Sequence, residues 1–289
     1  MIRRLIFGLS LAVLGLPALA GPPTTAEAAE PPRDVWFPSG TLFSPLVADP
    51  RWPGFGVSYH RYVNDRYLER AYTVALGASI PVWRSASGDL EWGFQGGAWS
   101  VFDRDKPSVD QFNTDFLGSL FIAGRLGQGD AAYLVRAMHT STHLGDEYLL
   151  NEPDLERENF SFERLDGFVS DTFPLADDDW IGRFYAGVGV ALGEPNPSDW
   201  SDVRAQWGVE LRGRPFGFGG TPFIAADVQH EEARDFTPDL SLRAGIELPR
   251  SDHGSAFRAG IDYYVGREPN GQFWRDDVQM IGVGLHFTF

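Results

Sequence analysis

The chain has 289 residues, 43% of them hydrophobic, which is enough for a substantial core. Its formal net charge of −16 argues against binding to a polyanion such as nucleic acid. The absence of cysteine excludes disulfides, thiolate metal sites and a cysteine nucleophile. Glycine (33 residues) and aromatic side chains (14%) are both plentiful, a combination that suits antiparallel sheets better than helical bundles.

Residues 1–20 have the pattern of an export signal. Two arginines near the start precede an apolar run, and a small-x-small cleavage site follows at 18–20. The apolar run is too short to span a bilayer comfortably. We therefore expect cleavage near Ala20, a leader and periplasmic N-terminal segment over 21–53, and a folded domain over 54–289.

From Gly54 onward, the chain breaks into segments in which unlike residues alternate, the signature of strands with two different faces. One parity is apolar, as in 74–82, 133–137, 203–211, 240–248 and 281–289. The pattern in the first of these segments places Val82 on the apolar face. The other parity carries ionised groups in mid-strand: Arg136, Arg183, Arg204, Glu210, Arg243 and Arg258.

This pattern predicts an all-β fold, a transmembrane antiparallel outer-membrane β-barrel of about 12 strands with an apolar exterior and a polar interior. A soluble sandwich could look similar over one or two strands, but the alternation continues along nearly the whole chain. Tight turns alternate with longer, often acidic loops, so we place the turns in the periplasm and the loops outside. We expect the wall to contact outer-membrane lipid and lipopolysaccharide, and the C-terminal Phe289 to engage the barrel-assembly machinery.

One segment fits the alternation poorly. Phe160 and Phe162 share the parity of Arg164 and Asp166, and the stretch that follows is long for a periplasmic turn. The sequence leaves the strand register open there.

Three stretches carry a family resemblance: LFSPLVADPRWPGFGVSYHRY (42–62), HTSTHLGDEYL (139–149) and PFIAADVQHEEARDFTPDLSLRAGIEL (222–248). In this order they resemble a bacterial family of exported proteins with the domain of unknown function twelve-oh-seven. The resemblance covers nearly all of the mature chain and implies an outer-membrane barrel, but no activity. Whether residues 36–53, which contain the ADPR element, plug the barrel or bind something in the periplasm stays open.

The candidate active-site residues lie in MHTSTHLGDEY (138–148). His139 and Ser141 share the parity of the apolar face, so they should point toward lipid near the outer rim of a spanning strand. Residues i and i+2 on a strand are roughly 6.6–6.8 Å apart at Cα, so His139 could take the proton of Ser141. Asp146 and Glu147 are candidates for the group that orients the histidine.

This His-x-Ser pair is similar to that of outer-membrane phospholipase A and the lipid A deacylases, barrel enzymes whose pair lies on the outer wall of a strand. The resemblance implies His139 as base and Ser141 as nucleophile. Thr142 and His143 stand where the phospholipase has Asn-Gly, and Pro153 stands near the place of the third member. The polar residues around that position are Asn151, Glu152 and Asp154.

Three functions stay open. The first is a structural or surface-interaction barrel, in which the segment is only an interfacial girdle beside a structured loop. The second is a lipid-ester hydrolase using Ser141 and His139, and the third is a small-solute channel. No cofactor is predicted, although hard ions such as calcium favour carboxylate clusters like that of Asp146, Glu147, Glu152 and Asp154. A barrel of about twelve strands can be filled by its own side chains, which disfavours a free-diffusion porin.

Overall fold

The computed structural model describes residues 33–63, 65–151, 160–175, 179–198, 200, 203–217, 219–248 and 255–288. The expected signal peptide and the C-terminal Phe289 lie outside these residues. The described residues form three short helices: α1 (Asp146–Asn151), η1 (Glu232–Arg234) and η2 (Gly271–Phe273). Within the described residues, no helix has the length and apolar character needed to cross a membrane.

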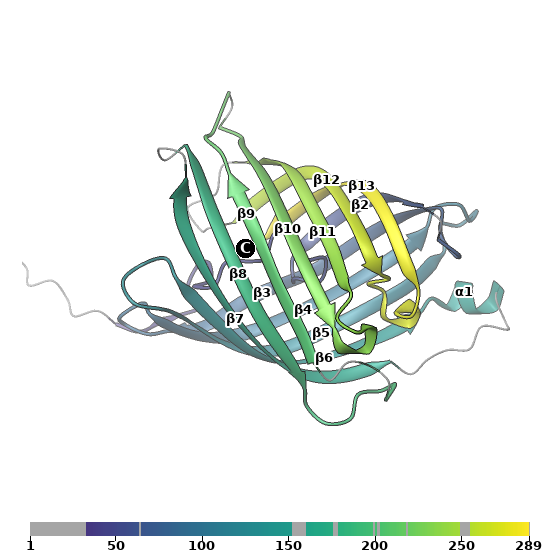
Figure 1. The fold of residues 1–289 in the computed structure, drawn as a ribbon, viewed down its shortest axis with the longest axis horizontal. Coiled ribbons are helices and arrows are strands. Elements are labelled where there is room, and N and C mark those ends of the chain that lie inside the picture. Colours follow the sequence, from purple (N-terminus) through teal and green to yellow (C-terminus); the bar gives the residue numbers. More distant parts are fainter. Residues whose placement is uncertain are drawn as a thin grey trace, which may run out of the picture. The chain divides into compact units, whose positions relative to one another are not determined.

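The fold is a closed ring of twelve long strands (Figure 1). They are β2 (Phe55–Val63), β3 (Arg70–Arg84), β4 (Leu90–Asp103), β5 (Gln111–Arg125), β6 (Ala132–Leu144), β7 (Ser161–Leu175), β8 (Trp180–Ala191), β9 (Val203–Arg212), β10 (Thr221–Glu231), β11 (Pro238–Glu247), β12 (Ala256–Arg267) and β13 (Asp277–Thr288). Each strand pairs antiparallel with its chain neighbours, and β13 pairs with β2. A two-residue strand, β1 (Val35–Trp36), pairs with the end of β3.

Closure leaves no edge strand in the ring, so the backbone N–H and C=O groups of the wall bond within the sheet. The predicted antiparallel β-barrel of about twelve strands is confirmed. The two faces of the wall differ as the alternation predicted. Large apolar side chains point outward and are exposed, among them Leu76, Ile80, Leu120, Val188 and Val283. An apolar surface of this extent is stable in lipid rather than in water.

The inner face of the wall is polar and paired. Its ion pairs include Arg136–Asp166 at 2.8 Å, Arg183–Glu210 at 3.2 Å and Arg258–Glu247 at 2.7 Å. All six of these side chains are buried. The charged residues that the sequence places in mid-strand therefore face the lumen, where each finds an opposite charge.

The connections lie alternately at the two ends of the barrel, and the three longest of them share one end. Those at one end are residues 85–89, 126–131, 176–179, 213–220 and 248–255, and those at the other end are 64–69, 104–110, 145–160, 192–202, 232–237 and 268–276. The turn after β7 is short because β7 continues to Leu175 and β8 begins at Trp180. Most of the residues that looked like a long turn in the sequence therefore belong to the end of β7.

One expectation about register needs correction, and one register that the sequence left open is now defined. Val82 is buried, because the β3–β4 register shifts between Pro81 and Trp83 and turns its side chain away from the apolar face. In the segment that fitted poorly, Phe160 and Phe162 are buried in the lumen together with Arg164. Their shared parity is therefore real, because the lumen is lined there by both aromatic and charged side chains.

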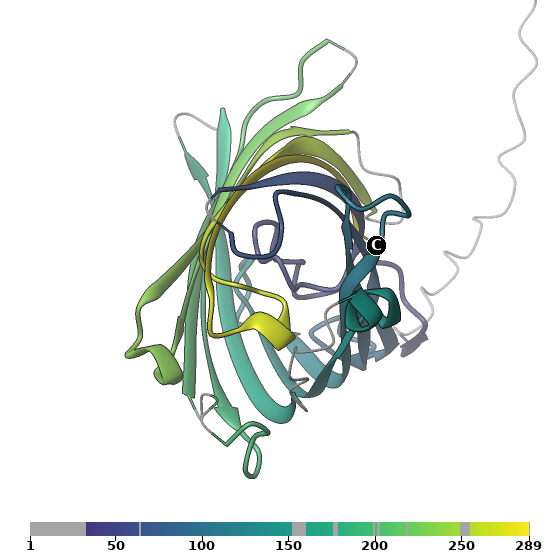
Figure 2. The ribbon, with the colours of Figure 1, turned by 90° about the vertical axis from the view of Figure 1, so that its right-hand side faces the viewer.

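Residues 40–53, named the plug here, lie inside the barrel rather than in the periplasm (Figure 2). Their apolar members Phe43, Leu46 and Trp52 are buried in one cluster with Phe168 and Tyr185 of the wall. Lumen side chains satisfy the backbone of the plug. Glu210 accepts from the Val47 N–H, Arg183 donates to the Ser44 and Pro45 carbonyls, and Arg243 donates to the Val47 carbonyl.

Candidate functional site on the outer wall

Strand β6 presents alternate side chains to the two faces of the wall. His139 and His143 point outward and are exposed, and Ser141 between them is half-buried. Thr142 points inward, where its hydroxyl donates to the Asn113 side-chain oxygen at 3.0 Å. The predicted outward orientation of the His-x-Ser pair follows directly from this alternation.

The histidine of this pair has a carboxylate partner on the neighbouring strand. His139 and Glu163 face each other across the β6–β7 ladder, and His139 Nδ1 lies 2.8 Å from Glu163 Oε1. The two side chains are 53% and 55% exposed. Both therefore lie on the outer surface of the barrel, at its long-loop end.

The carboxylate sets the roles of the two imidazole nitrogens. An ionised Glu163 can only accept a hydrogen bond, so it holds the proton of His139 on Nδ1. The lone pair of a neutral imidazole then lies on Nε2. A base–orienter pair of this kind is one half of the arrangement that activates a serine nucleophile.

Ser141 follows two positions after His139 on the same face, roughly 6.6–6.8 Å away at Cα. No hydrogen bond joins the two side chains in the described structure, a common state for catalytic groups without substrate. The cross-strand neighbours of Ser141 are Phe116 on β5 and Ser161 on β7. The His143 ring packs edge-on against Phe116 with 5.7 Å between centroids, so an aromatic surface borders the serine.

The acidic residues named from the sequence occupy a different place. Asp146 and Glu147 form the exposed first turn of α1, and no ion pair within the described part of the chain connects them to His139. The side chain of Asn151, and Glu152 and Asp154, lie outside the described residues. The sequence analysis did not name Glu163, the residue that the fold brings to His139.

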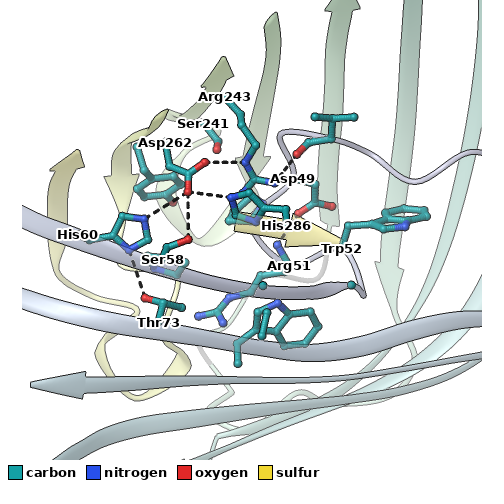
Figure 3. A pocket seen from close by; sticks show the side chains of 18 of the residues that line it. Asp49, Arg51, Trp52, Ser58, His60, Thr73, Ser241, Arg243, Asp262 and His286 are labelled. Carbon is teal, nitrogen blue, oxygen red and sulfur yellow. Dashed lines mark hydrogen bonds and ion pairs between the residues drawn. The ribbon is translucent and has the colours of Figure 1, made fainter. Parts of the chain in front are cut away.

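The lumen holds a second cluster of chemistry-bearing residues (Figure 3). It borders a cavity of about 100 Å³ between the plug and the wall. Asp262 is its centre: its carboxylate accepts from Arg243 Nε at 2.7 Å, from the Ser58 hydroxyl at 3.2 Å and from His286 Nε2 at 3.1 Å. His60 Nε2 lies 3.7 Å from the same carboxylate.

This lumenal cluster is organised for structure rather than for nucleophilic chemistry. Ser58 donates to the Asp262 carboxylate and not to a histidine, and that carboxylate is already engaged by Arg243 and His286. Arg243 links the carboxylate to the plug through the Val47 carbonyl at 2.6 Å. Among the described residues, no group of three or more His, Asp or Glu side chains has the arrangement of a metal site.

The family of the chain is established by comparison with known protein families. Residues 25–289 match the family described as "Protein of unknown function (DUF1207)". The chain belongs to this family. The resemblance read from the ADPR and HxSxHLGDE elements is thereby confirmed. A comparison with curated proteins finds no match.

Solved structures of outer-membrane barrels share the fold of this DUF1207 member. Outer membrane phospholipase A from Escherichia coli aligns with a TM-score of 0.56 at 14% identity, over 81% of this chain and 93% of that one. The Salmonella typhi phospholipase dimer with bound calcium aligns with a TM-score of 0.55 at 13% identity, over 82% and 93%. LpxR from Salmonella typhimurium reaches a TM-score of 0.44 at 10% identity, over 82% and 100%. The first two likenesses show that this is an outer-membrane barrel fold.

Proposed function

We propose that this outer-membrane barrel is a serine hydrolase of lipid esters, with Ser141 as nucleophile, His139 as base and Glu163 as the residue that orients the base. The observation that carries the proposal is the 2.8 Å contact between His139 Nδ1 and Glu163. His139 lies two residues before Ser141 on the same outward face of β6. A triad on the lipid-facing wall serves an ester held in the outer leaflet.

The chemistry follows from the assigned protonation of His139. Nε2 of His139 removes the proton of the Ser141 hydroxyl as its oxygen attacks the ester carbonyl, and Glu163 stabilises the imidazolium that forms. Collapse of the tetrahedral adduct breaks the bond to the alcohol oxygen, which leaves with the proton from Nε2. Water, deprotonated by the same nitrogen, then cleaves the acyl-serine, releases the fatty acid and restores the serine.

The negative charge on the carbonyl oxygen needs a stabilising group, because the backbone N–H groups of β6 are engaged in the sheet. A calcium ion is one candidate. A solved structure of the similar phospholipase contains calcium, and the exposed carboxylates of Asp146 and Glu147 are hard oxygen donors near the end of β6. We therefore propose that activity depends on calcium, and chelation by EDTA tests this.

The decisive experiment measures fatty-acid release by the purified barrel in detergent micelles, from phospholipid and from lipid A, with calcium and with EDTA. We expect Ser141→Ala and His139→Ala to lower the rate by about a thousandfold or more, because the groups of a triad act as a unit. Ser161→Ala is the matched control: this serine faces Ser141 across the ladder on the same wall and should retain full activity. An active Ser141→Ala variant, or a wild-type barrel inactive on every ester, would refute the proposal.

An inactive barrel would favour the structural or surface-interaction function predicted from the acidic loops. The solute-channel hypothesis is tested separately by planar-bilayer conductance. We expect a silent bilayer, since the plug fills the lumen with side chains such as Phe43, Leu46 and Trp52. Recognition by the barrel-assembly machinery through Phe289 stays part of the proposal, and deletion of this residue should slow insertion.

A further inference from the structure

A second cavity, of about 80 Å³, lies in the lumen near the long-loop end of the barrel. Six of its polar lining residues come from the ends of five strands and from the β8–β9 loop: Thr140, Arg164, Trp200, Arg204, Glu231 and Arg267. We name this cavity the outer chamber. A water molecule needs roughly 10–15 Å³ of such space, so the chamber has room for several waters or for one small ligand.

Unsatisfied polar groups gather in this chamber. Nine buried side-chain nitrogen or oxygen atoms in the described residues have no hydrogen-bond partner, and five of the nine belong to chamber residues. They are Thr140 Oγ1, Trp200 Nε1, Arg204 Nε, Glu231 Oε2 and Arg267 Nε. Buried polar atoms are nearly always paired in folded proteins, so a cluster of unpaired ones around one cavity points to a missing binding partner.

The charged side chains of the chamber are also incompletely paired. Glu231 Oε1 lies 3.8 Å from Arg164 Nη1, 3.7 Å from Arg204 Nε and 3.7 Å from Arg267 Nη2. Each distance is within ion-pair range and beyond a hydrogen bond. Three guanidiniums therefore surround one carboxylate without closing on it, although all four side chains are buried.

Other acids only partly offset this excess of positive charge. Asp166 accepts from Arg164 Nε at 2.6 Å, but it is shared with Arg136. Asp49 of the plug and Asp115 also line the chamber, but each has a donor of its own: Asp49 accepts from Gln206 at 3.1 Å, and Asp115 lies 2.8 Å from Arg51. The five unpaired atoms of the chamber are thus three N–H donors, one hydroxyl oxygen and one carboxylate oxygen.

We infer that the outer chamber binds a phosphate group that carries a proton, either as inorganic phosphate or as a phosphomonoester. Its oxygens accept from Trp200 Nε1, Arg204 Nε and Arg267 Nε, as guanidinium and phosphate geometry favours. Its P–OH donates to Glu231 Oε2. A fully deprotonated oxyanion such as sulfate satisfies the three donors but places its charge against Glu231 with no proton between them. This site is independent of the outer-wall serine.

The test measures binding to the full-length barrel refolded in the presence of each ligand, so that access through the loops does not limit occupancy. Inorganic phosphate, glycerol 3-phosphate and sulfate are compared by isothermal titration in detergent at pH 7. We expect saturable binding of phosphate and at least about tenfold weaker binding of sulfate, the loss of one charge-assisted hydrogen bond. Tighter binding of inorganic phosphate than of glycerol 3-phosphate would assign the free ion, and the reverse order would assign the monoester.

Two variants locate the site. Trp200→Phe removes one donor and keeps the ring contacts with Phe160 and Trp274, so phosphate affinity should fall about tenfold. Trp52→Phe is the matched control, since Trp52 Nε1 is also buried without a partner but borders the other cavity. Its phosphate affinity should not change.

Glu231→Gln tests the role of the proton. The amide can donate to either anion, so this variant should bind phosphate and sulfate alike. The inference is overturned if no phosphate binds, which would leave water as the only occupant. Equal phosphate and sulfate affinities in the wild-type barrel would also overturn it, as would equal responses of Trp200→Phe and Trp52→Phe.

Discussion

Glu163 and Asp166 lie on the same strand, β7, and face opposite sides of the wall. The Glu163 side chain is 55% exposed and has one partner, His139. The Asp166 side chain is 1% exposed and lies between two arginines, 2.8 Å from Arg136 and 2.6 Å from Arg164. The inner carboxylate is needed to keep two buried cations neutralised. Among the described residues, the outer one forms a side-chain ion pair with His139 alone and neutralises no buried cation.

The largest expected effect is on stability and comes from the inner carboxylate. Asp166→Ala leaves Arg136 and Arg164 buried without their shared anion, so the free energy of unfolding should fall by about 3–5 kcal/mol. Glu163→Ala should lower it by only about 0.2–1 kcal/mol, the range for exposed pairs. Urea unfolding in lipid vesicles, followed by tryptophan fluorescence, measures both. Similar losses for the two variants would contradict the assignment of the two faces.

A third carboxylate, Glu268, sharpens the comparison because it is buried without an arginine at ion-pair distance in the described residues. It lies in the loop after β12 and accepts from the Asn270 backbone and side chain. Burial raises the pKa of Glu268 from 4.5 to about 7. The folded protein therefore favours the protonated form of Glu268. The stability that this protonation contributes is fully present below the unfolded pKa and is lost as pH rises through about 7.

The corresponding measurement is the stability of wild type and Glu268→Gln as a function of pH. Between pH 5 and pH 7 the wild type should lose of order 2 kcal/mol relative to the variant, whose amide does not titrate. Thermal unfolding across this range gives the difference. A constant gap between the two proteins would mean that Glu268 is solvated at the barrel mouth.

The last prediction concerns the outer carboxylate and catalysis. Glu163→Ala should lower the lipid-ester hydrolysis rate by about tenfold or more, equivalent to about 1.4 kcal/mol, because His139 loses the group that fixes its tautomer. Glu163→Gln should keep the ring in place but favour the wrong tautomer, so it should not restore the rate. Unchanged activity in both variants would remove Glu163 from the mechanism and leave only the serine and histidine.

Much of the wall could be predicted from the sequence. Arg136, Arg183 and Arg204 each interrupt an apolar alternation at the opposite parity, and the structure buries all three in the lumen. The direction of His139 followed from the same parity count. These predictions succeed because the alternation of side chains can be read within a single strand. An apolar outer face and a charged inner face then show which side each residue belongs to.

Glu163 could not be found in the same way. Its pairing with His139 depends on the β6–β7 register, which is set across a long connection, and on the parity of β7, which the sequence left open. A usable signal was present: Arg164 and Asp166 belong in the lumen, so Glu163 must face outward. The buried phenylalanines on the same parity obscured it. The plug was equally inaccessible, since residues 40–53 have no periodic pattern and acquire their place only from the lumen around them.

The plug also has a consequence for the order in which the barrel is built. The hydrogen bonds of Val47 reach Glu210, 163 positions along the chain, and Arg243, 196 positions along, and Arg51 reaches Asn270 across 219 positions. The part of the folded domain that leaves the ribosome first can therefore settle only after most of the wall exists. We therefore expect the contacts between the plug and the wall to be among the last to form during folding.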